Sequence, residues 1–135
     1  MSEELQSWHF GMTEDEANTL LALVLDSRKT ATSSSLRAYE IEDEPLPEPG
    51  QRSIITDWAG TPGCIVEITD VQVIPFDELT FDLVQLEGED ADLDSWQAEH
   101  RRFFTAEAAE FGYTFSPDMP VVFERSRVVE VLQHV

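Results

Sequence analysis

Helix-like and strand-like segments follow one another in an irregular order along this 135-residue chain, and that order limits the folds open to it. The clearest helix signal is the capping box Thr13-Glu14-Asp15-Glu16, which is followed by apolar residues at helical spacing as far as Asp26. The run 30–35 is rich in hydroxyl and β-branched residues and predicts a short strand directly after that helix. The acidic segment 40–50 contains three prolines and is expected to form an extended loop.

The middle of the chain predicts a hairpin. Segments 51–58 and 64–74 have strand-like patterns, and the glycine- and proline-containing segment 59–63 between them has the composition of a turn. The second of these strands is long, so a bend or bulge is expected within it. A short helical segment over 76–86 leads to a second long helix, which we expect Asp94 to cap and Gly112 to end. The valine-rich run 121–132 predicts a closing strand.

This order of elements favours an α+β domain built around a small curled sheet or barrel. A doubly wound parallel sheet would need regular alternation of strands and helices, together with phosphate-binding glycines that the sequence lacks. The length of 135 residues predicts a single domain over 1–135.

The charge of the chain restricts its ligands. Its net charge is −20, and its basic residues form no cluster larger than a pair. Nonspecific binding of long nucleic acid requires a basic stripe, so the composition argues against it. A small neutral or singly charged ligand remains compatible with this charge. We expect the partner to be a small nucleoside or a short RNA.

Location and cofactor chemistry are predicted mainly from what the sequence lacks. No run of 18 apolar residues appears, and Met1-Ser2-Glu3-Glu4 lacks the pattern of a secretion signal, so we expect a cytoplasmic protein without membrane contact. Cys64 is the only cysteine, which rules out an internal disulfide and argues against a thiolate metal site. We expect it to be a buried strand residue, and we expect no metal and no cofactor. The oligomeric state is left open.

Lys29 is the only lysine in the chain and is the first candidate for chemistry. Unlike arginine, lysine can give up its proton and act as a base. Thr32 supplies a hydroxyl that such a base could activate, and Thr30 is a rival or an assistant. Positions three apart on a flat strand face opposite sides, so pairing Lys29 with Thr32 requires Lys29 to lie in the turn before the strand.

A third group is needed to hold the lysine, and the acidic loop after residue 86 offers several carboxylates. Glu87 follows an apolar stretch and is expected at the lip of a pocket. His100 shares a helix face with aromatic residues and is predicted to pack there. The alternative to an enzyme is a noncatalytic module that binds a nucleotide or short RNA through Lys29, Arg28 and an aromatic residue such as Tyr39 or Trp58. Ribonuclease action is a third possibility.

The ordered motifs of the chain resemble those of the bacterial ASCH domain proteins over nearly its whole length. They are Trp8-x-Phe10-Gly11, Arg28-Lys29-Thr30-Ala31-Thr32, Tyr39-Glu40, Pro45-Leu46-Pro47, Pro75-Phe76-Asp77-Glu78, Glu87-Gly88-Glu89, Trp96 with His100-x-x-Phe103-Phe104, and Asp118-Met119-Pro120-Val121-Val122-x-Glu124. The resemblance implies a PUA-like small β-barrel with flanking helices, and a cleft beside the first helix that holds RNA or a modified nucleoside.

Small bacterial proteins similar to this chain include an amidohydrolase that removes the acetyl group of N4-acetylcytidine. The resemblance carries its lysine, threonine and glutamate triad to Lys29, Thr32 and Glu87, with Glu89 as the other candidate for the acid. We add Arg28, Thr30, Tyr39 and Glu89 as predicted substrate-binding residues. The chain departs from the usual motif at two positions, where a glycine and an arginine are replaced by Ser27 and Ser34. Other members bind or cleave RNA, so the fold alone does not fix the reaction.

Overall fold

The computed structural model describes residues 5–132, so Met1–Glu4, on which part of the expected location rests, lie outside the described residues. It contains a five-stranded sheet in the order β1-β3-β4-β5-β2 and has the predicted α+β class. The strands are β1 (Ser7–Trp8), β2 (Ala31–Ser35), β3 (Arg52–Thr56), β4 (Pro62–Pro75) and β5 (Pro120–Val131). The helices are α1 (Glu14–Leu25), α2 (Leu36–Ile41), α3 (Phe81–Val84) and α4 (Leu93–Phe111), with the 3₁₀ turns η1 (Phe76–Glu78) and η2 (Gln85–Glu87).

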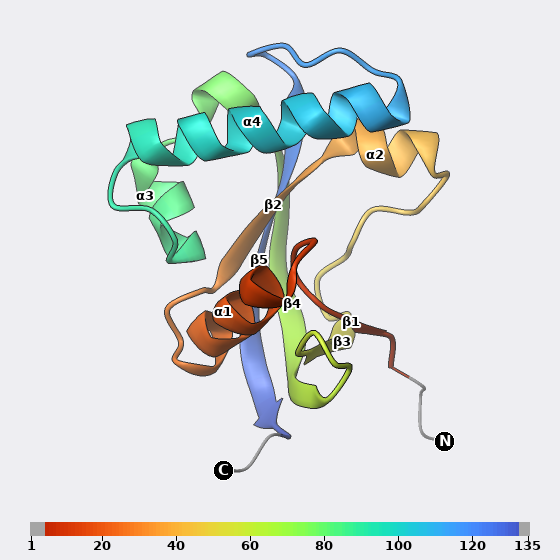
Figure 1. Ribbon diagram of the computed structural model, residues 1–135, viewed down its shortest axis with the longest axis vertical. Coiled ribbons are helices and arrows are strands. Elements are labelled where there is room, and N and C mark those ends of the chain that lie inside the picture. The colour runs from red at the N-terminus through yellow and green to blue at the C-terminus, as the bar shows by residue number, and fades with distance from the viewer. Residues whose placement is uncertain (1–4, 133–135) are drawn as a thin grey trace.

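Strands β4 and β5 form a long antiparallel ribbon through the centre of the molecule (Figure 1). The register between them shifts twice, between Ile65 and Val66 and between Ile68 and Asp70. An extra residue at such a bulge bends the strand and increases its twist, which confirms the irregularity expected in β4. Helix α4 crosses the upper end of the ribbon, and α1 lies beside its lower half (Figure 1).

Helix α1 begins as its capping box predicts, with the Thr13 hydroxyl accepting a hydrogen bond of 3.1 Å from the Glu16 amide. The helix ends at Leu25, and the turn after it places Ser27 in the left-handed region at φ 61°. The next two amides, of Arg28 and Lys29, both donate to the Leu23 carbonyl, at 2.9 and 3.1 Å. Lys29 therefore lies in the turn before β2, as its pairing with Thr32 requires.

Helix α4 starts earlier than predicted, because its N-cap is Asp92 and not Asp94. Asp92 has the extended backbone of a cap and accepts a 2.8 Å hydrogen bond from the Ser95 amide, whereas Asp94 is already in the first turn. The predicted end at Gly112 is confirmed by its left-handed φ of 83°. An aspartate in the first turn also stabilises the helix through its dipole, and this explains why both positions fit the sequence pattern.

Three local features differ from the sequence prediction. Strand β1 and helix α2 were not predicted. Helix α2 is capped by the Ser35 hydroxyl and includes the first two residues of the segment 40–50, which was expected to be a loop. The helical segment predicted over 76–86 is broken into η1, α3 and η2, because Leu79 and Thr80 have extended backbones. The last of these turns, η2, lies beside the start of β2.

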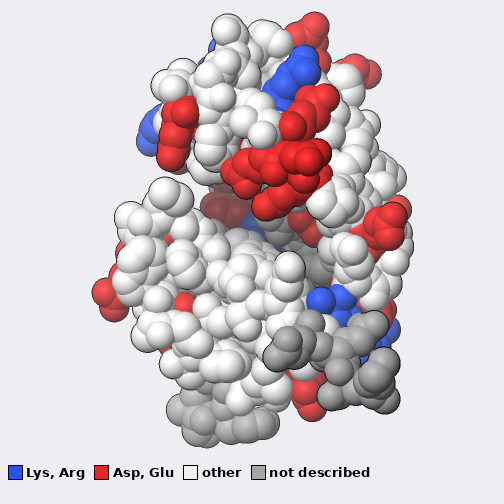
Figure 2. Space-filling view, turned by 90° about the vertical axis from the view of Figure 1, so that its right-hand side faces the viewer, with Lys and Arg blue, Asp and Glu red and all other residues white. Residues whose placement is uncertain are grey.

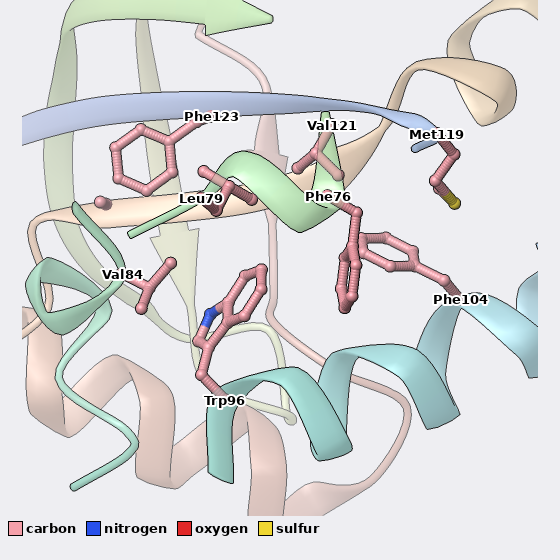
Figure 3. Packing of buried hydrophobic residues seen from close by; sticks show 9 residues of the cluster. Phe76, Leu79, Val84, Trp96, Phe104, Met119, Val121 and Phe123 are labelled. Atoms are coloured by element: carbon pink, nitrogen blue, oxygen red, sulfur yellow. The ribbon is translucent and has the colours of Figure 1, made fainter. Parts of the chain in front are cut away.

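The core has two hydrophobic clusters, one at each end of the ribbon. The upper cluster is built around Phe76, which stacks on Trp96 at 5.5 Å and meets Phe104 edge-on at 6.1 Å (Figure 3). The lower cluster joins α1 to the sheet and includes Phe10 and the fully buried Cys64, which was predicted to be a buried strand residue. The turn that carries Lys29 connects α1 in the lower cluster to β2, whose Ala31 packs into the upper one.

Candidate functional site

A cavity of about 1700 Å³ opens between the two halves of the molecule. Figure 2 shows the hollow, with acidic side chains gathered on the surface above it. One wall is formed by β2 and β5, which contribute Thr32, Ser34, Glu124 and Ser126. The other walls come from the amino-terminal segment with Trp8 and Phe10, from Tyr39 of α2, and from the segment 44–53.

Lys29 lines this cavity and is 5 % exposed. Its ammonium donates to the Ala31 carbonyl at 3.1 Å and to the Glu89 carboxylate at 2.8 Å. It lies 3.8 Å from the Glu87 carboxylate and 5.4 Å from the centre of the Phe10 ring. The structure thus brings the predicted lysine and both candidate acids together.

Glu87 lies behind Lys29 and is 2 % exposed, so it is buried and not at a lip as expected. One of its oxygens accepts hydrogen bonds from the Ser33 hydroxyl at 2.8 Å and the Trp96 indole at 3.0 Å. The other lies 3.5 Å from His100 Nε2. Burial alone would raise the pKa of Glu87, but the hydrogen bonds and the positive charges of Lys29 and His100 lower it below its usual value.

Gly88 allows the two acids to lie on either side of Lys29. It has a φ of 73°, and a Cβ atom there would collide with the backbone carbonyl oxygen of Arg28. The same loop is joined to the start of β2 by the Thr30 amide, which donates to the Leu86 carbonyl at 2.7 Å. The close approach of these two backbone segments fixes Glu87 and Glu89 beside the turn that carries Lys29.

Thr32 lies on the other face of β2. Because strand residues alternate between faces, Ala31 and Ser33 point toward the upper core and Glu87, whereas Thr32 lines the cavity. Across residues 5–132, no hydrogen bond joins the Thr32 hydroxyl to Lys29 or to either acid. Thr32 therefore shares the cavity with Lys29 but does not contact Glu87, which lies on the opposite side of the strand.

The remaining predicted residues divide between the cavity and its surroundings. Tyr39 lines the cavity, with its hydroxyl 3.5 Å from that of Ser34, and burial raises its pKa. Thr30 is absent from the lining of the large cavity and lines a smaller one of about 200 Å³, which Lys29 also lines. The side chain of Arg28 is 71 % exposed and pairs with Asp26 at 2.8 Å, so the structure does not bring it to the large cavity.

Two further residues belong to the site although sequence reasoning did not place them there. Glu124 of β5 is directly opposite Thr32 in the ladder and lines the same cavity. His100 stacks on Trp96 at 4.1 Å, which confirms its predicted packing, and also reaches Glu87. The alternation of residues in β5 indicates on which face of the sheet the Glu124 side chain lies. Only the register between β2 and β5 shows that Glu124 is the direct partner of Thr32.

The contact between His100 and Glu87 predicts a pH-dependent contribution to stability. Burial would lower the pKa of His100, but its hydrogen bond to Glu87 and the charge of that carboxylate raise it above 6.5. A raised histidine pKa gives stability that is complete below about 6.5 and is lost as the pH rises through the folded-state pKa. Urea denaturation should therefore show that His100→Asn destabilises the protein more at pH 6 than at pH 9. An effect that does not change with pH would contradict an ionic role for His100.

No group of three or more histidine, cysteine, aspartate or glutamate side chains within 5–132 is arranged to hold a metal ion. Within the same residues, none of the helices combines the length and the apolar character needed to span a bilayer.

Comparison with known structures finds proteins that are similar in sequence as well as in fold. A crystal structure of a protein from Enterococcus faecalis V583 is 39 % identical, with a TM-score of 0.87, and the match covers 93 % of this chain and 77 % of that one. The ASCH domain of Lactobacillus crispatus JV V101 is 35 % identical, with a TM-score of 0.89, and the match covers 93 % of this chain and 80 % of that one. No match is found among curated proteins.

An ASCH protein of Zymomonas mobilis has the same general fold at 10 % identity, with a TM-score of 0.58 and coverage of 97 % of this chain and 73 % of that one. Together with the Lactobacillus structure, the arrangement of sheet and helices confirms the predicted PUA-like α+β fold. The family model of the ASCH domain matches residues 6–130 of this chain. The protein therefore belongs to the ASCH domain family.

Proposed function

We propose that the large cavity is the active site of an amidohydrolase that removes the acyl group of an N4-acylated cytidine. The observation that carries this proposal is the position of Lys29, which is 5 % exposed and lines a cavity that also contains the Thr32 hydroxyl. Nucleophilic catalysis by threonine requires a base that can reach the hydroxyl, and Lys29 is the amine that shares the cavity with Thr32. The acids beside Lys29 hold the amine in place.

The reaction would proceed through an acyl-enzyme. Lys29 first gives its proton to a neighbour, and Glu89, 2.8 Å away, is placed to accept it. Thr32 Oγ1 then attacks the amide carbonyl while Lys29 Nζ takes the hydroxyl proton. The tetrahedral intermediate collapses, the C–N bond breaks, and Lys29 returns that proton to the leaving cytidine amine. Water hydrolyses the threonine ester, which releases the carboxylic acid and restores the hydroxyl.

The cavity suits a small, largely uncharged substrate. Its volume of about 1700 Å³ leaves ample room for a nucleoside, because cavities that bind small molecules typically have about 300–1,000 Å³. Aromatic side chains of Trp8, Phe10 and Tyr39 line it and offer surfaces for a base. The ammonium of Lys29 is already paired with acids, which makes it a poor anchor for a phosphate backbone.

The test is incubation of the protein with a panel of acylated nucleosides, including N4-acetylcytidine. We expect Thr32→Ala and Lys29→Arg to lower the hydrolysis rate by about 100-fold or more, because each removes a group that transfers a proton or forms a bond. Thr32→Ser keeps the hydroxyl and should retain much of the activity. Thr61→Ala, in the exposed turn before the β4 hairpin strand, is the matched control. Unchanged hydrolysis by Lys29→Arg would refute the mechanism.

A noncatalytic binding module is the second candidate. The pairing of Lys29 with Glu89 at 2.8 Å favours it, because a carboxylate partner stabilises an ammonium and so opposes the loss of its proton. In that case no nucleoside is hydrolysed, and Lys29→Arg retains ligand binding because the charge is kept. Ribonuclease action, the third candidate, predicts RNA cleavage that weakens as the salt concentration rises. The three candidates thus differ in product, in their response to Lys29→Arg and in salt dependence.

A further inference from the structure

We infer that Glu124 is a specificity-determining residue that makes this cavity select a phosphate-free nucleoside over the corresponding nucleotide. This inference deepens the proposed function and rests on it for the nucleoside class of the ligand. It concerns a residue on the cavity wall to which the hydrolytic mechanism gives no role.

The position of Glu124 places it beside any substrate that reaches Thr32. Thr32 of β2 and Glu124 of β5 are direct partners in an antiparallel ladder, and both line the cavity. Directly opposed residues in such a ladder have Cβ atoms about 4.5–5.5 Å apart on the same face of the sheet. A carbonyl group held at the Thr32 hydroxyl would therefore have the Glu124 carboxylate as its neighbour.

The Glu124 carboxylate has acceptor capacity that the protein does not use. Within residues 5–132, no donor forms a hydrogen bond with it, and the only charge close enough to influence it is that of Lys29. Burial raises the pKa of Glu124, and Lys29 offsets this only in part. A partly buried carboxylate without a protein donor is well suited to accept a hydrogen bond from an N–H or O–H group of a ligand.

The balance of charge around the cavity explains why a phosphate would be rejected. Four charged side chains line it: Lys29, Arg52, Glu44 and Glu124. The two cations are already paired, Lys29 with Glu89 at 2.8 Å and Arg52 with Glu67 at 3.0 Å. Glu44 and Glu124 are the two cavity-lining carboxylates left without such a partner among the described residues. An anionic ligand in the cavity would therefore meet like charge from both carboxylates.

The test measures binding and does not depend on hydrolysis. Isothermal titration calorimetry would compare the common ribonucleosides and N4-acetylcytidine with their 5′-monophosphates, on the wild type, Glu124→Gln and Glu130→Gln. Glu130 is on the same strand but is exposed and outside the cavity, so its substitution makes the same change in net charge elsewhere. Glutamine keeps the size of the side chain and removes its charge.

We expect the wild type and Glu130→Gln to bind at least one nucleoside about tenfold or more tightly than its monophosphate, and Glu124→Gln to lose most of this preference. The inference is overturned if no nucleoside binds, if the monophosphate binds as tightly, or if Glu124→Gln keeps the full preference. A preference without hydrolysis would refute the proposed function alone. Hydrolysis that accepts the monophosphate equally well would refute this inference alone.

Discussion

Glu87→Ala is expected to lower the free energy of unfolding by about 3–5 kcal/mol, the usual cost of removing one partner from a buried ion pair. Glu87 is 2 % exposed and holds several donors at once. Without it, the Trp96 indole and the Ser33 hydroxyl, now at 3.0 and 2.8 Å from its carboxylate, lose their acceptor inside the core. Each buried donor left unsatisfied adds to the cost.

Glu89→Ala is the matched control for this prediction, because Glu89 also pairs with Lys29 but its side chain is 30 % exposed. Water can replace a partly exposed carboxylate, so we expect a loss of about 1 kcal/mol or less. Urea denaturation followed by circular dichroism would measure both variants. Equal losses would show that the hydrogen bonds from the core to Glu87 contribute little.

Gly88→Ala is expected to lower the free energy of unfolding by about 3 kcal/mol or more, through two effects that add. The first is the left-handed backbone, with a φ of 73°, which a residue with a Cβ atom adopts only at a cost. The second is the collision of that Cβ atom with the Arg28 carbonyl, which would push the loop away from the turn that carries Lys29. The variant should therefore also disturb the pairing of Lys29 with both acids.

Gly112→Ala separates these two effects. Gly112 has a similar φ of 83°, but nothing lies within 4 Å of a Cβ atom built there. It should therefore carry only the backbone cost, about 1–2 kcal/mol. The same denaturation measurement on the two variants gives the cost of the collision by difference. If they lose the same stability, the loop and the turn are not held in close contact.

Local signals in the sequence were sufficient to predict the two long helices, α1 and α4, and most strands. The cap at Thr13 and the glycine at 112 were correct because capping depends on the few residues around each helix end. Asp94 was wrong as a cap because two aspartates near the start of α4 fit the same pattern, and only the backbone conformation distinguishes them. Strand β1 was missed since two residues carry almost no periodicity.

The candidate site was predictable only in part, because its geometry depends on long-range pairing. The sequence identified Lys29 from its uniqueness, and the structure buries it against both candidate acids. The sequence does not reveal that Thr32 and Glu87 lie on opposite sides of β2, because that depends on where the loop after η2 packs. Nor does it reveal the partnership of Thr32 with Glu124, which is set by the register of two strands about ninety residues apart.

Lys29 is both the only lysine of the chain and a buried one, so amine-reactive chemistry can probe its exposure at a single site. Since no other lysine is present, any acylating or reductively alkylating reagent that targets ε-amino groups has a single side-chain destination. That destination is 5 % exposed and held by a carboxylate, so it is shielded from such a reagent in the folded protein. The extent of labelling at this one position therefore reports how often the Lys29 amine leaves its carboxylate partner and becomes exposed.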